Sequence, residues 1–72
     1  MERDRWEAAQ LRVADEELPE LEGRLTRLRS FLKSKTFTQL DSTDQALLVD
    51  QEAAMTLVVE VLQKRIAHWE SK

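Results

Sequence analysis

The chain has 72 residues, of which 42% are hydrophobic and 35% charged, and its net charge is −3. A chain of this length forms one small domain, and one glycine and one proline leave too little turn material for a multi-stranded β architecture. The absence of cysteine excludes disulfides and thiolate metal sites. So short a chain rarely builds a self-sufficient core, and oligomerisation is the remaining means of stabilisation. Composition therefore predicts an all-α protein that forms a homo-oligomer.

The chain carries no segment typical of membrane insertion or export. Its longest unbroken apolar run, residues 46–49, is far shorter than the roughly 20 residues of a membrane-spanning helix. The opening segment MERDRWEAAQ lacks the apolar core of a signal peptide. We therefore expect a cytoplasmic protein that does not bind membranes.

In the first half of the chain, leucine and alanine recur at alternating steps of three and four residues. The series consists of Leu11, Ala14, Leu18, Leu21, Leu25, Leu28 and Leu32. This heptad spacing predicts a helix over about residues 3–34, and Trp6 and Val13 extend its apolar surface toward the N-terminus. Pro19 removes a backbone hydrogen bond from that helix, so we expect a kink or a short break there. The alternative is a separate N-terminal helix that ends near Glu17, with Pro19 in the first turn of the next helix.

Residues 34–43 are expected to form a connector, because two threonines disfavour helix there and an Asp-Ser pair favours a turn. Ser42 and Gln45 have the spacing of a capping box, which predicts a second helix over about residues 43–69. The sequence thus predicts a helical hairpin that occupies the single domain 1–72.

The second helix has more apolar surface than one partner helix can cover. The heptad series expected to face the first helix consists of Leu48, Gln51, Met55, Val58, Leu62, Arg65 and Trp69. A second apolar stripe lies beside it and consists of Leu47, Ala54, Leu57 and Val61. In a monomer this second stripe would be a large exposed patch, so we expect other copies of the chain to cover it.

Charge lies in blocks along the chain. Residues 1–22 carry eight acidic and three basic side chains, residues 23–40 five basic and no acidic ones, and residues 41–60 five acidic and no basic ones. An antiparallel hairpin places the basic end of the first helix beside the acidic start of the second, so charge pairing alone explains the pattern. The alternative is a compact site for a small anion. Duplex nucleic acid is not expected as a partner of an acidic protein, because its affinity depends on many phosphate contacts.

Few residues are suited to catalysis. His68 is the lone histidine, and a chain with one glycine has no phosphate-binding loop, so we expect no enzyme, metal or cofactor. Arg65 is more informative, because it interrupts an apolar series and a buried arginine needs an anionic partner. That partner is either an acidic side chain or a ligand phosphate. Arg24 and Thr26 flank Leu25 and point about 200° apart on an ideal helix.

An ordered set of residues has the spacing of a known family. The landmarks are Arg12-Val13, Phe31-Leu32, Phe37, Leu40-Asp41, Leu47-Leu48, Gln51, Met55, Leu62 and Arg65-Ile66. With them, residues 12–69 resemble the phage anti-CBASS cyclic-nucleotide sponge family. The resemblance implies an all-helical protomer that assembles into a hexamer and binds cyclic dinucleotides and cyclic trinucleotides in separate pockets between protomers. Such proteins do not cleave the ligand, but keep it from the CBASS effector in the cytoplasm of the infected bacterium.

The resemblance also implies roles for single residues. The basic residue of the dinucleotide pocket falls on Arg24, and the Thr and Arg of the trinucleotide pocket fall on Thr26 and Arg65. The family's base-stacking Tyr falls on Ala9, and Trp6, one turn earlier, is the candidate to replace it in the dinucleotide pocket. The predicted function is therefore non-catalytic sequestration of cyclic di- or trinucleotides that blocks host CBASS immunity. The alternative is a helical phage accessory protein that inhibits a host protein through an apolar helix face.

Overall fold

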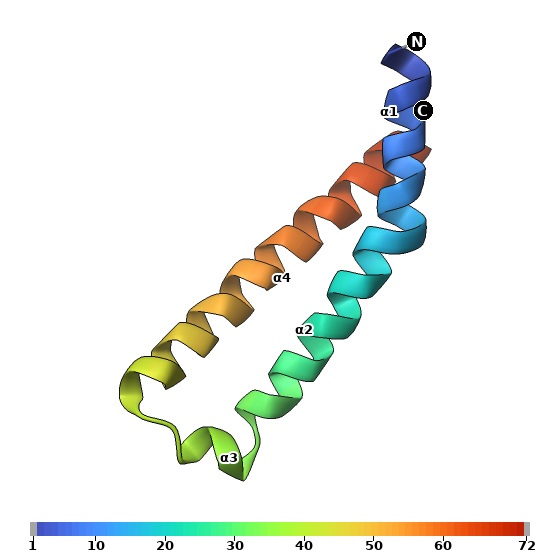
Figure 1. Ribbon diagram of the computed structural model, residues 1–72. Helices are drawn as coiled ribbons and strands as arrows, with labels where there is room; N and C mark the ends of the chain where they lie inside the picture. The colour runs from blue at the N-terminus through green and yellow to red at the C-terminus, as the bar shows by residue number, and fades with distance from the viewer. Residues whose placement is uncertain (1, 72) are drawn as a thin grey trace.

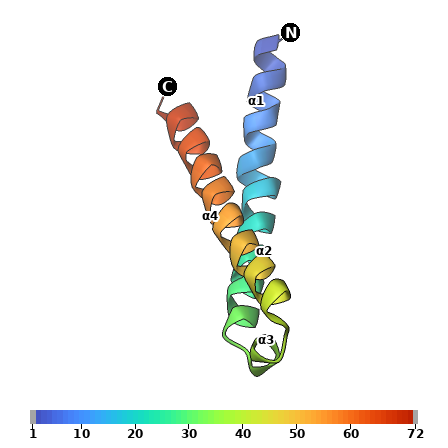
Figure 2. The same cartoon turned by 90° about the vertical axis from the view of Figure 1, so that its left-hand side faces the viewer.

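The computed structural model describes residues 2–71, and the side chains of residues 4–71, as a helical hairpin (Figure 1). The first arm consists of α1 (Glu2–Arg12), a π-helical segment (Val13–Glu17) and α2 (Leu18–Leu32), which follow one another without a break. The short α3 (Lys35–Thr38) lies in the turn, and α4 (Ser42–Glu70) forms the second arm. Figure 2 shows that α3 closes the end of the hairpin opposite to the chain termini. The predicted all-helical hairpin is confirmed.

The core is a single line of contact between the two arms. Among the described residues, the buried apolar side chains are Val13, Leu25 and Val59. The radius of gyration is 16.0 Å, against about 11 Å for a compact domain of this length. The accessible surface is 5653 Å², about 1,000 Å² more than is usual for a monomeric protein of this mass. Much apolar surface therefore stays uncovered in a single chain. Within residues 2–71, no helix is long and apolar enough to cross a membrane.

The face of α4 that meets the first arm differs in part from the predicted heptad series. Val59 is 7% exposed, whereas Val58, which the series includes, is 48% exposed. Gln51 of that series also lies on the exposed side. The interior of α4 follows steps of four and three residues from Leu48, so Glu52, Val59 and Ile66 lie inward, each one position after a member of the predicted series. The exposed apolar side chains of α4 that share one face are Leu47, Ala54, Leu57, Val58 and Val61, and we call them the α4 stripe.

A π-helical segment, Val13–Glu17, separates α1 from α2. The Leu18 N–H donates to the carbonyl of Val13, five residues earlier, where an α-helix would use the carbonyl four residues earlier. Pro19 follows in the first turn of α2, and it has no N–H to donate. The wider turn therefore accommodates the proline within a continuous helical backbone.

The π turn changes which residues of α1 face α4. A π turn holds about one residue more than an α-helical turn, so the interior face moves by one position, or about 100°. Gln10 is 1% exposed and lies in the interior beside Val13, whereas Leu11 is 49% exposed. The prediction that Leu11 belongs to the buried series is wrong, because that series assumed an uninterrupted α-helix.

The connector contains one helical turn, α3, where none was predicted. The Ser34 hydroxyl caps this turn by accepting a hydrogen bond from the Phe37 N–H at 3.2 Å. The Phe37 ring packs edge-on against Phe31, with ring centroids 6.3 Å apart. A local cap and an aromatic contact thus outweigh the low helix preference of threonine in this segment.

The start of α4 lies one residue earlier than the capping box predicts. Asp41 caps the helix, because its carboxylate accepts a hydrogen bond from the Asp44 N–H at 2.8 Å. Ser42 is the first helical residue and does not act as the cap. The Gln45 side chain donates to the Phe37 carbonyl at 2.9 Å, so it ties α4 to the turn and does not close the predicted capping box.

Replacing Asp41 by Ala should therefore lower the free energy of unfolding by about 1 kcal/mol, the usual cost of losing a helix N-cap. Ser42→Ala should cost clearly less, since Ser42 lies inside the helix. Urea unfolding of both variants at one protomer concentration measures the difference. An equal or larger loss for Ser42→Ala would contradict the assignment of the cap.

Candidate functional site

The four candidate residues lie in two places in one protomer. Trp6 and Arg65 meet at the end of the hairpin that carries the chain termini, whereas Arg24 and Thr26 lie on α2. Arg65 contacts Gln10 on the first arm. Thr26 lies sixteen residues after Gln10, which is about 24 Å along the helix. Within one protomer, the two pairs of candidates are therefore well separated.

Arg65 reaches from α4 to α1 and is half-buried. Its Nη2 donates to Oε1 of Gln10 at 2.6 Å, and Nε2 of Gln10 donates to the backbone carbonyl of Arg65 at 3.3 Å. The guanidinium carbon lies 5.4 Å from the centroid of the Trp6 ring, within the range of a cation–π interaction. One neutral amide and one aromatic face thus hold the head of Arg65.

The positive charge of Arg65 has no carboxylate partner among the described residues. The ion pairs that join two described residues are Arg24 with Glu20 and Arg29 with Glu52. The contact that holds Arg65 on the first arm is an amide, where the sequence left open an acidic side chain. The guanidinium thus lies among neutral groups, and a phosphate is a partner that a guanidinium binds well.

Arg24 lies on the exposed surface of α2. Its Nη2 is 2.6 Å from the carboxylate of Glu20, one helical turn earlier, and both side chains are exposed. Exposed ion pairs of this kind contribute little to stability, because water screens them and both side chains lose freedom. The Arg24 guanidinium can therefore leave Glu20 and bind another anion at a small cost in free energy.

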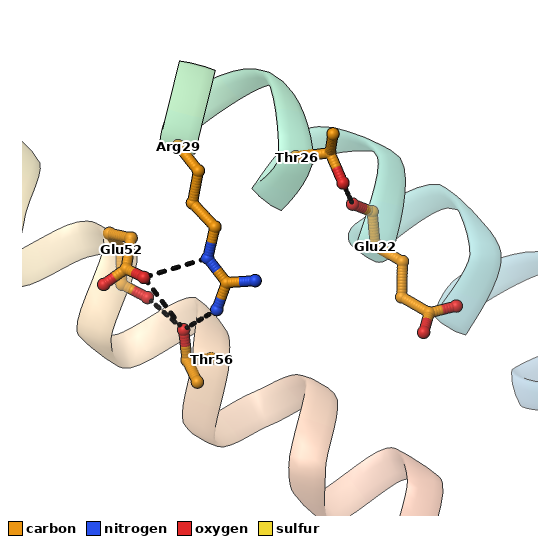
Figure 3. A network of polar contacts seen from close by, with 5 residues as sticks. All are labelled: Glu22, Thr26, Arg29, Glu52 and Thr56. Carbon is orange, nitrogen blue, oxygen red and sulfur yellow. Dashed lines mark hydrogen bonds and ion pairs between the residues drawn. The ribbon is translucent and has the colours of Figure 1, made fainter. Parts of the chain in front are cut away.

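Thr26 donates its hydroxyl proton to the backbone carbonyl of Glu22 at 2.9 Å (Figure 3). One turn later, Arg29 crosses to α4, where its Nε is 3.0 Å from the Glu52 carboxylate and its Nη2 donates to the Thr56 hydroxyl at 2.8 Å. This contact joins the basic end of the first arm to the acidic start of the second. Charge pairing thus accounts for Arg29, and the Thr26 hydroxyl oxygen can still accept a hydrogen bond.

Gln10 is a site residue that sequence reasoning did not single out. Its amide is nearly inaccessible to water and makes both hydrogen bonds to Arg65. A signal was present, because Trp6, Gln10 and Val13 are spaced by four and three residues and so share one helix face. The heptad series through Leu11 concealed that face, since it was continued across Pro19 without a change of phase.

The described residues contain no group of three or more histidine, cysteine or carboxylate side chains that could hold a metal ion. His68 lies exposed on α4. The chemistry that the described side chains offer is anion binding by arginine, with hydrogen bonds from an amide and a hydroxyl and with one aromatic face.

The Sequestin family model matches residues 7–68, nearly the whole chain. The chain therefore belongs to the Sequestin family, the family of cyclic-nucleotide sponges that its landmark residues indicate, and that prediction is confirmed. The family name denotes sequestration, a binding activity without turnover. Neither the curated proteins nor the solved structures include a significant match to this chain.

Proposed function

We propose that this member of the Sequestin family is a phage protein that sequesters cyclic oligonucleotide second messengers. It binds cyclic trinucleotides and cyclic dinucleotides in the cytoplasm of the infected bacterium, does not cleave them, and so keeps the host CBASS effector inactive. The observation that carries the proposal is the half-buried guanidinium of Arg65, held by neutral groups and without a carboxylate partner among the described residues.

Capture is stoichiometric and follows from the charge of the arginines. A guanidinium binds two phosphate oxygens through parallel hydrogen bonds, which gives both strength and geometric selectivity. The Thr26 hydroxyl adds a polar contact, and an aromatic ring such as Trp6 adds stacking with a base, worth about 1–3 kcal/mol. These are binding interactions, and none of them activates a nucleophile.

The pockets form between copies of the chain. Thr26 lies about 24 Å along the first arm from the residue that contacts Arg65, so a small ligand reaches both only where a second protomer brings its own Thr26 close. The surplus accessible surface of the protomer supports such an assembly. We propose the hexamer that the family resemblance implies, with the α4 stripe as part of its interfaces.

The α4 stripe also supports a second candidate function. An exposed apolar helix face can dock into a groove of another protein. The chain would then be a phage accessory protein that inhibits a host protein. Native mass spectrometry with a mixture of cyclic di- and trinucleotides separates the two functions, because the sponge retains nucleotide and the protein inhibitor retains none.

Replacing Arg65 by Ala should lower the affinity for a cyclic trinucleotide by about 2–5 kcal/mol, because a desolvated phosphate loses its charged partner. Arg29→Ala is the matched control, since it removes the same charge from a residue already paired with Glu52. Isothermal titration calorimetry measures affinity, and a thermal melt measures stability. Unchanged affinity of Arg65→Ala with a lowered melting temperature would assign Arg65 a purely structural role.

Replacing Val58 and Val61 by Glu should convert the oligomer into monomers or poorly folded chains, because the change buries charge in a subunit interface. Val49→Glu is the control, since Val49 is also an exposed apolar residue of α4 but lies outside the α4 stripe. Light scattering measures the mass of each variant. A wild-type mass for the double variant would show that the α4 stripe is not an oligomer interface.

Replacing Trp6 by Ala should weaken trinucleotide binding, because Trp6 contacts Arg65 in the protomer. This assignment revises the sequence-based expectation that Trp6 serves the dinucleotide pocket with Arg24. The loss should be about 1–3 kcal/mol, the range for one stacked aromatic contact. Arg24→Ala should weaken dinucleotide binding alone. Titration of both ligands into both variants tests this assignment. If Trp6→Ala loses affinity for the dinucleotide alone, Trp6 belongs to the dinucleotide pocket, as the sequence-based expectation had it.

A further inference from the structure

We propose that Gln10 is the positioning residue of the phosphate site: it orients the guanidinium of Arg65 and leaves its charge intact. The inference rests on the proposed function, in which Arg65 binds a ligand phosphate. Gln10 itself lies in the interior, with 1% of its surface exposed, so its role is exerted through Arg65 and not through contact with the ligand.

The two hydrogen bonds between Gln10 and Arg65 need an amide. Oε1 of Gln10 accepts from Nη2 of Arg65 at 2.6 Å, while Nε2 donates to the Arg65 carbonyl at 3.3 Å. A side-chain amide offers one acceptor and one donor group at the same end, whereas a carboxylate only accepts. The amide therefore ties both the head and the backbone of one residue of α4 to α1.

The neutrality of Gln10 matters as much as its geometry. A carboxylate 2.6 Å from the guanidinium would form an internal ion pair, and a ligand phosphate would have to compete with it. The amide restrains the guanidinium without that competition, and Trp6 restrains it from a second side. A guanidinium ordered before the ligand arrives loses less conformational freedom on binding, which favours affinity.

The change Gln10→Glu separates positioning from neutralisation, because it keeps the shape and the acceptor but adds the charge. We expect this variant to fold with a melting temperature close to that of the wild type, since the new ion pair with Arg65 offsets the lost hydrogen bond to the Arg65 carbonyl. Its affinity for the probe, cyclic triadenylate, should fall at least tenfold. Gln39→Glu is the control, since it adds the same charge on an exposed residue at the opposite end of the hairpin, and it should change neither quantity.

Gln10→Met provides the second variant, because it keeps the volume, removes both hydrogen bonds and adds no charge. The expected order of affinity is wild type, then Gln10→Met, then Gln10→Glu, since only the last neutralises Arg65. Equal losses in both Gln10 variants, together with equally lowered melting temperatures, would overturn the proposal by showing that Gln10 serves folding alone.

The same titrations distinguish this inference from the proposed function. If the wild type binds cyclic triadenylate, Arg65→Ala does not, and Gln10→Glu binds like the wild type, then the role of Gln10 is wrong and the sponge function stands. If the wild type binds neither cyclic triadenylate nor a cyclic dinucleotide, both the sponge function and the role of Gln10 are overturned.

Discussion

Two helices packed side by side can cover only one face of each other, and this limit governs the rest of the molecule. The buried apolar side chains among the described residues form one line between the arms, represented by Leu25 on α2 and Val59 on α4. The opposite face of α4 carries the α4 stripe, which stays exposed in one protomer. An isolated hairpin of this kind is a poor free-standing domain. Its apolar surplus and its well-separated candidate residues are the two features on which the proposed assembly rests.

Two arginines bridge the arms, and they differ in what their partners do to their charge. Arg29 meets a carboxylate and a hydroxyl of α4, so its charge is compensated within the hairpin. Arg65 meets a neutral amide and an aromatic ring, so its charge stays available. The same residue type thus serves as a structural tie in one place and is the proposed binding group in another. Burial and partner chemistry decide between the two roles.

The leucine spacing was sufficient to predict the hairpin and most of the packing of α2, because a local period reports directly on which face of a helix is buried. The same spacing failed at Leu11 and at Val58. At Leu11 a π turn changes the phase, and on α4 the interior follows steps of four and three residues from Leu48, so Val59 faces the first arm in place of Val58. Arg65 could be identified as a polar residue in an apolar series, and the spacing of Gln10 from Val13 places Gln10 on the inner face of α1. The contact between Gln10 and Arg65 could not be predicted, since it joins residues far apart in the chain. In the proposed assembly, the roles of Arg24 and Thr26 depend on further copies of the chain, which no local pattern specifies.

The π turn also sets how the arm tolerates changes in length. Gln10 and Leu18 both face inward although eight residues separate them, because the π turn takes up one residue more than two α-helical turns hold. Loss of one residue between positions 13 and 17 would shorten this separation to seven residues, so an ordinary α-helix would keep Gln10 facing α4 and Leu11 facing solvent. Closing the π turn without losing a residue would instead rotate α1 by one position and bring Leu11 inward. In this arm a single-codon deletion is therefore a milder evolutionary event than its place inside a helix suggests, because the wide turn already holds one residue more than the helix needs.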